Sequence, residues 1–361
     1  MFNLFQNIHI DWLGKRKAFI FVSIFIMLAG LFSAMIRQYT PGGTEAFNLG
    51  VDFKGGTVVT AKFRELPEDD AIRSALNTSG IQDPVIQRTL SKPNEVLIKI
   101  PLIEAKDAQT EQERTEQVQS GRLAVKKALD TFGTEADGES TLDTKPDAAY
   151  KILGTDSVGA VAGSQLRNQA VTATLLGLVG ILLFIAFRYD WTYAAGAVLA
   201  VFHDVLMVLS FFSIFQWEIN LTVIAAVLTI VGFSVNDSIV IFDRIRENLS
   251  ASRGKSLYAL TNDSINQTLS RTVITTGLVL LSVLALVLFG GEVLRSFSLA
   301  LLVGFTLGAY STIAIASPIA IWWQSKMGGG VKAVKEAVIP QKGEKMASSA
   351  RRSVTRRPVT R

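Results

Sequence analysis

Residues Ile219–Phe242 read INLTVIAAVLTIVGFSVNDSIVIF, an apolar run of 24 residues. A transmembrane helix needs about 20 predominantly apolar residues, so this run predicts a membrane span. Asn236 and Asp237 interrupt it shortly before Asp243, the next charged residue along the chain. An ionised carboxylate within hydrocarbon costs roughly 2.5–3.5 kcal/mol on insertion scales. Asp237 therefore either lies close to water or serves a function that requires a carboxylate there.

Five other apolar windows are also long enough to cross a bilayer. The chain of 361 residues is 49% hydrophobic, which is too apolar for an ordinary soluble enzyme. The sequence therefore predicts a polytopic α-helical membrane protein with six transmembrane helices. The first window is too long for a cleaved signal peptide. The predicted spans are Ala18–Ile36, Ala170–Phe187, Trp191–Phe215, Ile219–Phe242, Thr272–Phe289 and Ser296–Trp323.

The distribution of Lys and Arg predicts the orientation, because cytoplasmic loops carry an excess of both. Lys15, Arg16 and Lys17 precede the first span, whereas the loop at residues 216–218 has no basic residue. Both termini are therefore expected in the cytoplasm of a bacterial cell. The other basic residues predicted on that side are Arg188, Arg244, Arg246, Arg253 and Lys255.

Residues 324–361 form a basic tail that is predicted to be disordered. Attraction to anionic membrane lipids would contribute about 1 kcal/mol per basic residue near the surface. A solvated tail that follows the orientation rule explains the composition equally well. The net charge of +5 resides largely in this tail. Binding to nucleic acid is not expected, because it would need a basic patch on a folded domain.

A mainly polar segment at residues 37–169 is predicted to form an extracytoplasmic domain. Its elements follow the order β-α-β-β-α-β, which is the split βαβ arrangement of an α+β ferredoxin-like domain. Gly133–Lys145 is predicted to be a loop. The predicted strands are Phe47–Val51, Thr57–Phe63, Pro84–Leu90, Glu95–Ile100 and Ala148–Leu153, and the predicted helices are Glu68–Thr78 and Asp107–Phe132.

Composition argues against an enzyme. The chain has no cysteine and only two histidines, so thiolate chemistry and a His-rich metal site are excluded. No nucleophile–base set or phosphate-binding loop is apparent. We therefore expect no cofactor and no metal.

Asp237 is the first candidate for a functional site. At about 1.5 Å per residue it lies roughly 9 Å inside the apolar layer from Asp243. Asn236, Ser234 and Ser238 make this stretch polar on more than one side, which suits a surface that faces protein or water. A carboxylate that takes up and releases protons is the favoured interpretation. An interfacial Asp that caps a helix or reaches the surface is the alternative.

Arg271 begins the fifth predicted span, at the same membrane level as Asp237. The two side chains could form a switch with two states, one paired and ionised and the other separated and protonated. An ordinary flanking cation is an equally good explanation.

His203 and Asp204 lie in the middle of the third predicted span, in AVFHDVLMVL. Ionisable residues at this depth rarely face lipid. They are candidates for a proton relay or for a polar pair that bonds to its neighbours. Because adjacent helical positions point about 100° apart, the two are not expected to share one narrow face.

Two further motifs are polar or glycine-rich. Asp52, Gly55 and Gly56 stand at a turn before a predicted strand, and a Gly-Gly pair is usually only a turn. Asp243 and Arg244 open a charged stretch, predicted to be a solvated interfacial helix, and residues 256–269 are expected to lie along the membrane surface as well.

Several of these motifs together resemble the SecF family of bacterial protein-export membrane proteins, within the SecD/SecF family of the resistance-nodulation-division superfamily. The similarity extends over nearly the whole chain from Asn7 to Trp323, although Ala160 stands where the family commonly has proline. The motifs are GVDFKGGT at 50–57, SVGAVAGSQL at 157–166, FHD at 202–204, VNDSIVIFDRIREN at 235–248 and SRTVITT at 270–276.

The resemblance implies partners and a mechanism. Members associate with SecD and the SecYEG translocon, and use the proton-motive force to help a translocating unfolded polypeptide leave on the outer side. The family's motif residues that match Asp237 and Arg271 are implicated in proton movement. One charge crossing 100 mV yields about 2.3 kcal/mol, enough to bias a domain between two positions. The alternatives are a half-size efflux transporter of the same superfamily and a passive translocon scaffold.

Overall fold

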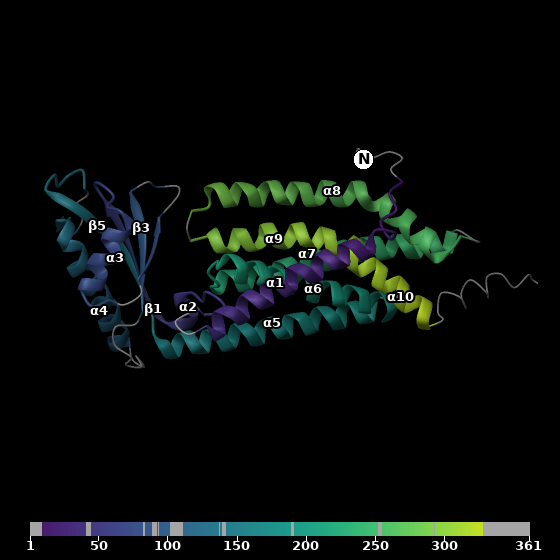
Figure 1. Ribbon diagram of the computed structural model, residues 1–361, viewed down its shortest axis with the longest axis horizontal. Coiled ribbons are helices and arrows are strands. Elements are labelled where there is room, and N and C mark those ends of the chain that lie inside the picture. The colour runs from purple at the N-terminus through teal and green to yellow at the C-terminus, as the bar shows by residue number, and fades with distance from the viewer. Residues whose placement is uncertain are drawn as a thin grey trace, which may run out of the picture.

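The computed structural model shows a long helical bundle with a small α+β domain at one end (Figure 1). It describes residues 9–40, 45–81, 84–88, 92, 94–101, 111–136, 138, 142–188, 191–251, 255–291 and 293–327. Most of the predicted basic tail lies outside these residues. We call the end of the bundle next to the α+β domain the domain end, and the opposite end the far end.

The bundle contains six helical segments long and apolar enough to span a membrane, which confirms the predicted number within the described residues. The sixth segment is interrupted by a π-helix at Thr312–Ala316, which separates α9 from α10. The helices are α1 (Arg16–Tyr39), α5 (Ala160–Arg188), α6 (Trp191–Phe215), α7 (Leu221–Ala251), α8 (Leu257–Phe289), α9 (Arg295–Ser311) and α10 (Ser317–Met327).

Two predicted surface segments belong instead to these long helices. α7 continues through Asp243 and Arg244 to Ala251, and α8 begins at Leu257, well before the predicted start at Thr272. The prediction of separate interfacial helices was therefore wrong. The Ser256 side chain caps α8 by accepting a hydrogen bond from the Ala259 N–H at 3.2 Å, which explains where this helix starts.

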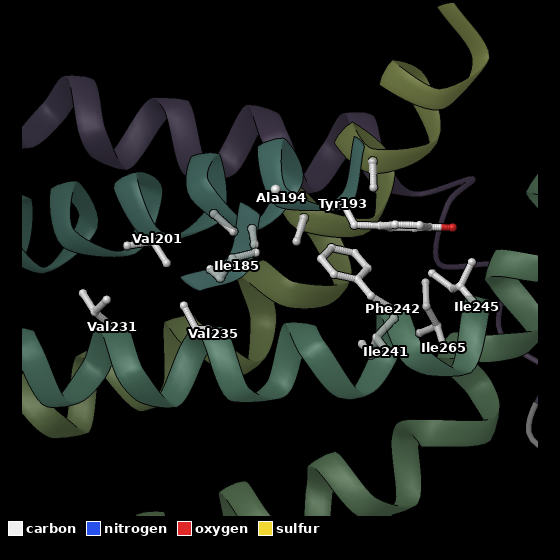
Figure 2. Close-up of a cluster of buried hydrophobic side chains, with 14 of the residues drawn as sticks. Ile185, Tyr193, Ala194, Val201, Val231, Val235, Ile241, Phe242, Ile245 and Ile265 are labelled. Atoms are coloured by element: carbon white, nitrogen blue, oxygen red, sulfur yellow. The ribbon is translucent and has the colours of Figure 1, made fainter. Parts of the chain in front are cut away.

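Helices α6, α7 and α9 form the interior of the bundle, whereas α1, α5 and α8 carry mostly exposed apolar side chains. Figure 2 shows part of this interior, where the ring of Phe242 on α7 lies beside that of Tyr193 on α6, with centroids 5.1 Å apart. Close approach of α7 and α9 requires a small residue, since a Cβ at Gly304 would lie 2.2 Å from Ile230 Cδ1. Gly304 therefore allows the two helices to pack closely.

The α+β domain has one five-stranded sheet with strand order β2-β3-β1-β5-β4. All neighbouring strands are antiparallel except β4 and β5, and the first four in this order have the topology of a ferredoxin-like fold. The strands are β1 (Gly56–Phe63), β2 (Val85–Arg88), β3 (Glu95–Ile100), β4 (Thr134–Glu135) and β5 (Ala148–Val158).

Two helices, α3 (Asp69–Thr78) and α4 (Glu111–Leu129), cover one face of the sheet. Alternate residues of β1 enter this core, namely Val59, Ala61 and Phe63, as expected for a strand with one buried face. From the helices, Ile72 and Leu129 are fully buried in the same core. The packing therefore accounts for the apolar periodicity seen in the sequence.

Two elements differ from their predictions. Phe47–Val51 is not a strand of the sheet; Leu49 makes an isolated bridge to Ile219, and α2 (Val51–Lys54) follows at once. The predicted loop Gly133–Lys145 contains the short edge strand β4, whose Glu135 is buried and forms ion pairs with Arg122 and Lys126. Hydrogen bonding to Glu135 raises the pKa of the Lys126 ammonium. Part of the predicted helix Asp107–Phe132 lies outside the described residues.

Candidate functional site

Asp237 lies in the far half of α7, on the face directed into the bundle. Its side chain is only 6% exposed. The Thr272 hydroxyl of α8 donates a hydrogen bond to Oδ1 at 3.1 Å. Oδ2 is buried and has no hydrogen-bond partner among the described residues. The carboxyl group is therefore only half satisfied, which is unusual for a buried polar group.

The neighbours of Asp237 on α7 separate by face. Ser234 and Ser238 stand three residues before and one after it, and both are buried, whereas Asn236 is exposed. The structure thus places Asn236 on a different face of the helix from Asp237. Its predicted place in a proton pathway stays a prediction.

Arg271 directly precedes Thr272 on α8, so α8 brings a cation into the neighbourhood of Asp237. The two charges are close enough to interact electrostatically. Arg271 itself is exposed, and no ion pair between the described residues joins it to Asp237. The structure therefore shows the pair in proximity but separated.

Asp204 in the middle of α6 is the second buried carboxylate, with no exposed surface. Its Oδ2 accepts hydrogen bonds from the hydroxyls of Ser234 on α7 at 2.5 Å and Ser311 on α9 at 2.8 Å. Its Oδ1 lies 3.0 Å from Nδ1 of His203. Both oxygens are thus engaged, and the group ties together the three interior helices.

His203 extends this cluster toward α1. It is buried beside Asp204, so the two adjacent residues meet although they leave the helix in different directions. The Nε2 atom is buried and has no hydrogen-bond partner among the described residues. The ring lies 6.3 Å from that of Tyr310, whose hydroxyl donates to the Phe19 carbonyl of α1 at 2.6 Å.

Two buried hydroxyl groups of α7, those of Ser234 and Ser238, stand on either side of Asp237 in the sequence. Ser234 bonds to Asp204, and one turn further along α7 the Ser238 hydroxyl lies 3.4 Å from that of Thr312. Thr312 begins the π-helix, a feature that is frequent at functional sites. None of Ser311, Thr312 and Thr272 was predicted as a site residue, although hydroxyl residues within apolar spans are a signal that points to them.

The glycine motif lies at the domain end and is more than a turn. Gly55 and Gly56 have φ angles of 78° and 148°, which favour glycine, and they connect α2 to β1. A Cβ at Gly163 of α5 would lie 3.0 Å from the Gly55 nitrogen. The motif at 50–57 therefore packs against the motif at 157–166, and Asp52 accepts a hydrogen bond from the Leu221 N–H, at the start of α7, at 3.0 Å.

Asp243 and Arg244 lie beyond the apolar part of α7. The Arg244 side chain donates to Gln267 of α8 at 2.6 Å and pairs with Glu247, while Asp243 is exposed. Arg244 thus joins the far ends of α7 and α8. Among the described residues, no group of three or more His, Asp or Glu side chains is arranged to hold a metal.

Comparison with known proteins agrees with this architecture. The family profile described as "Protein export membrane protein SecD/SecF, C-terminal" matches residues 139–326, and "SecD/SecF GG Motif" matches residues 43–65. "Protein translocase subunit SecF" of Koribacter versatilis is 37% identical, over 96% of this chain and all of that protein. "Protein translocase subunit SecF" of Escherichia coli O157:H7 is 35% identical, over 84% of each chain.

A longer relative carries the same region as one part. "Protein translocase subunit SecDF" of Thermus thermophilus is 38% identical, over 78% of this chain and 35% of its own. The crystal structure of SecDF from the same organism, described as a translocon-associated membrane protein, superposes with a TM-score of 0.69 at 33% identity, over 88% of this chain and 39% of that one. The chain belongs to the SecD/SecF family of protein-export membrane proteins and is a protein translocase subunit of the SecF type.

Proposed function

We propose that this subunit uses the proton-motive force to assist export of unfolded polypeptides, and that Asp237 is the group that takes up and releases the proton. The observation that carries the proposal is the buried Oδ2 of Asp237, which has no hydrogen-bond partner among the described residues. Thr272 holds the other oxygen. A buried carboxylate oxygen without a hydrogen-bond donor favours binding a proton, because the neutral carboxyl group costs less to bury than the ionised one.

Arg271 supplies the second state of the switch. A protonated Asp237 is neutral and suits the buried position, whereas an ionised Asp237 needs a compensating cation. Arg271 directly precedes Thr272, which bonds to Asp237. A displacement of α8 relative to α7 would therefore bring the Arg271 guanidinium to the Asp237 carboxylate. Proton binding would thereby favour one arrangement of these two helices over another.

His203 and Asp204 act in this proposal as a supporting pair. Nδ1 of His203 bonds to Asp204, so Nε2, which has no hydrogen-bond partner among the described residues, is the ring nitrogen available to a proton relay. The Ser234 hydroxyl of α7, three residues before Asp237, connects α7 to this pair by its hydrogen bond to Asp204. Asp204 acts as an anchor, because both of its oxygens are held by hydrogen bonds.

The setting of the switch follows from the charge distribution and the family. We place both termini in the cytoplasm and the α+β domain on the outer side of the bacterial inner membrane, because Lys and Arg gather at the far end. SecD is the expected companion and SecYEG the expected channel. One proton crossing 100 mV yields only about 2.3 kcal/mol. This free energy is enough to shift the α+β domain between two positions beside an unfolded polypeptide, but too small to unfold a stable protein.

The test is proton-driven export into inverted membrane vesicles with Asp237→Asn, which keeps the size of the side chain and removes its charge. Export driven by the proton gradient is expected to fall at least tenfold, to the rate seen without a gradient, while assembly with SecD persists. Asp263→Asn, which removes the charge of a partly exposed carboxylate paired with Lys255, is the control and should export normally. Normal export by Asp237→Asn would favour a passive scaffold instead.

A further inference from the structure

The start of α7 is held by the α+β domain through a set of contacts that the proposed proton site does not use. Asp52 of α2 accepts the hydrogen bond from the Leu221 N–H at 3.0 Å. Asn220 directly precedes Leu221, and its side-chain oxygen accepts a hydrogen bond from the Val223 N–H at 3.2 Å. The positive end of the α7 dipole thus has two side-chain caps, and the carboxylate comes from α2, the segment that leads into β1.

α2 is also fixed in the bundle by its neighbours in sequence. The Phe53 side chain is 5% exposed and packs in a core that includes Phe212 and Phe305. The segment before α2 runs parallel to the loop between α6 and α7, with the Gly50 N–H donating to the Ile219 carbonyl at 2.8 Å. Because β1 begins at Gly56, right after α2, this anchor continues directly into the central strand of the sheet.

A buried ion pair forms the second connection. Glu218, in the loop just before α7, is 9% exposed. Its Oε2 pairs with Lys99 of β3 and lies 3.4 Å from the Gln87 amide nitrogen of β2. A buried carboxylate requires such partners, so the pair holds the sheet in one position against the loop.

We propose that Asp52 and Glu218 are positioning residues that fasten the α+β domain to α7, so that a displacement of α7 at Asp237 moves the domain. From Leu221 to Asp237 the helix spans about 24 Å, and an α-helix transmits an axial or rotational shift over that length without breaking its own hydrogen bonds. The effect of Asp52 and Glu218 on transport rests on the proposed function of Asp237. Their attachment of the α+β domain to α7 does not.

The experiment uses the full chain with its companion in reconstituted membranes. The chain has no cysteine, so Ala71→Cys on α3 and Val293→Cys in the loop between α8 and α9 allow two spin labels at exposed positions. The distance distribution between them reports the position of the domain against the bundle. We expect one narrow distribution in this background and a clearly broadened one when Glu218→Gln is added, with export reduced about fivefold.

Rescue separates positioning from general damage. The charge exchange Lys99→Glu with Glu218→Lys should restore the narrow distribution and at least half of the export rate. Asp52→Asn keeps an oxygen that caps α7 and should resemble the parent, whereas Asp52→Ala should broaden the distribution. Lys92→Gln breaks an exposed ion pair with Glu95 on the same hairpin and should change neither measurement.

The outcomes distinguish this inference from the proposed function. An unchanged distance distribution and export rate in Glu218→Gln overturns the fastening role, whatever Asp237→Asn does. If Glu218→Gln frees the domain while Asp237→Asn exports normally, the fastening stands and the proton proposal fails. A Glu218→Gln variant that unfolds is replaced by Asp52→Ala, for which a narrow distribution counts against the inference.

Discussion

Asp204 and Asp237 are both aspartates buried in the same bundle, yet their surroundings are opposite. Asp204 receives hydrogen bonds at both oxygens from three interior neighbours. Asp237 receives one, and its second oxygen has no partner among the described residues. A saturated carboxylate stabilises one arrangement of helices, whereas an open one leaves a protonation change possible. The number of satisfied hydrogen bonds, and not depth in the bundle, is therefore what separates the two aspartates.

The largest effect on stability is expected from Asp204→Ala. It leaves the Ser234 hydroxyl and the Nδ1 of His203 without a partner, whereas the Ser311 hydroxyl keeps its bond to the Gly308 carbonyl. Unsatisfied buried groups cost about 1–3 kcal/mol each, so the loss should be about 2 kcal/mol or more. Thermal unfolding in detergent measures it, with Asp237→Ala as the matched comparison, which orphans only the Thr272 hydroxyl and should lose less.

Asp204→Asn refines the same test. Asparagine keeps one carbonyl oxygen, so it should retain more stability than alanine and export within about twofold of the parent. A variant that folds fully but loses proton-driven export would contradict the distinction drawn between the two aspartates, because Asp204 would then be a titrating group.

The sequence predicted the spans well because membrane insertion depends on length and apolar composition, which are local properties. Trp191–Phe215 was predicted with the same bounds that α6 has in the structure. The extensions of α7 and α8 beyond the apolar layer were missed, since polar residues there carry no hydropathy signal. Phe47–Val51 was mistaken for a sheet strand because its β-forming residues pair with the loop at Ile219 and not with the sheet.

The candidate site was only partly predictable from the chain. Asp237, His203 and Asp204 stood out as ionisable residues in apolar runs. Which hydroxyl meets which carboxylate depends on how α7, α8 and α9 rotate against one another, and a single sequence does not contain that information. The ion pair between Lys99 and Glu218 is a contact over 119 positions and was invisible for the same reason.

A smaller effect is expected from Thr272→Val, which removes the only hydrogen bond that Asp237 accepts from the described residues while keeping the shape of the side chain. One such bond contributes about 1 kcal/mol, which corresponds to a change of about fivefold. Proton-driven export should fall by about that factor. Thr275→Val is the control, because its hydroxyl bonds only to backbone carbonyls of its own helix. Equal losses in both variants would mean that Thr272 acts through helix stability.

The smallest effect is expected at Asp11, an exposed carboxylate that contrasts with the two buried ones. The hydroxyl of Tyr258 donates to its Oδ1 at 2.6 Å and the Gly14 N–H at 2.9 Å. These bonds, the one from Tyr258 foremost, lower the pKa of Asp11 below its ordinary value near 3.8. Because the folded pKa is the lower one, this contact contributes fully above that ordinary value and is lost as the pH falls below it.

The Asp11 contact helps hold the segment around Ile10 and Trp12 against Asn262 and Asn266 of α8. Limited proteolysis of this segment should therefore accelerate slightly as the pH drops below about 4, when an acid-active protease is used. Tyr258→Phe should raise the rate at neutral pH and flatten its acid dependence, whereas Asn262→Ala should raise it at every pH. A segment whose cleavage responds to Asn262→Ala but not to Tyr258→Phe is held by the backbone contacts alone. An exposed carboxylate would then contribute nothing measurable, in contrast to the two aspartates inside the bundle.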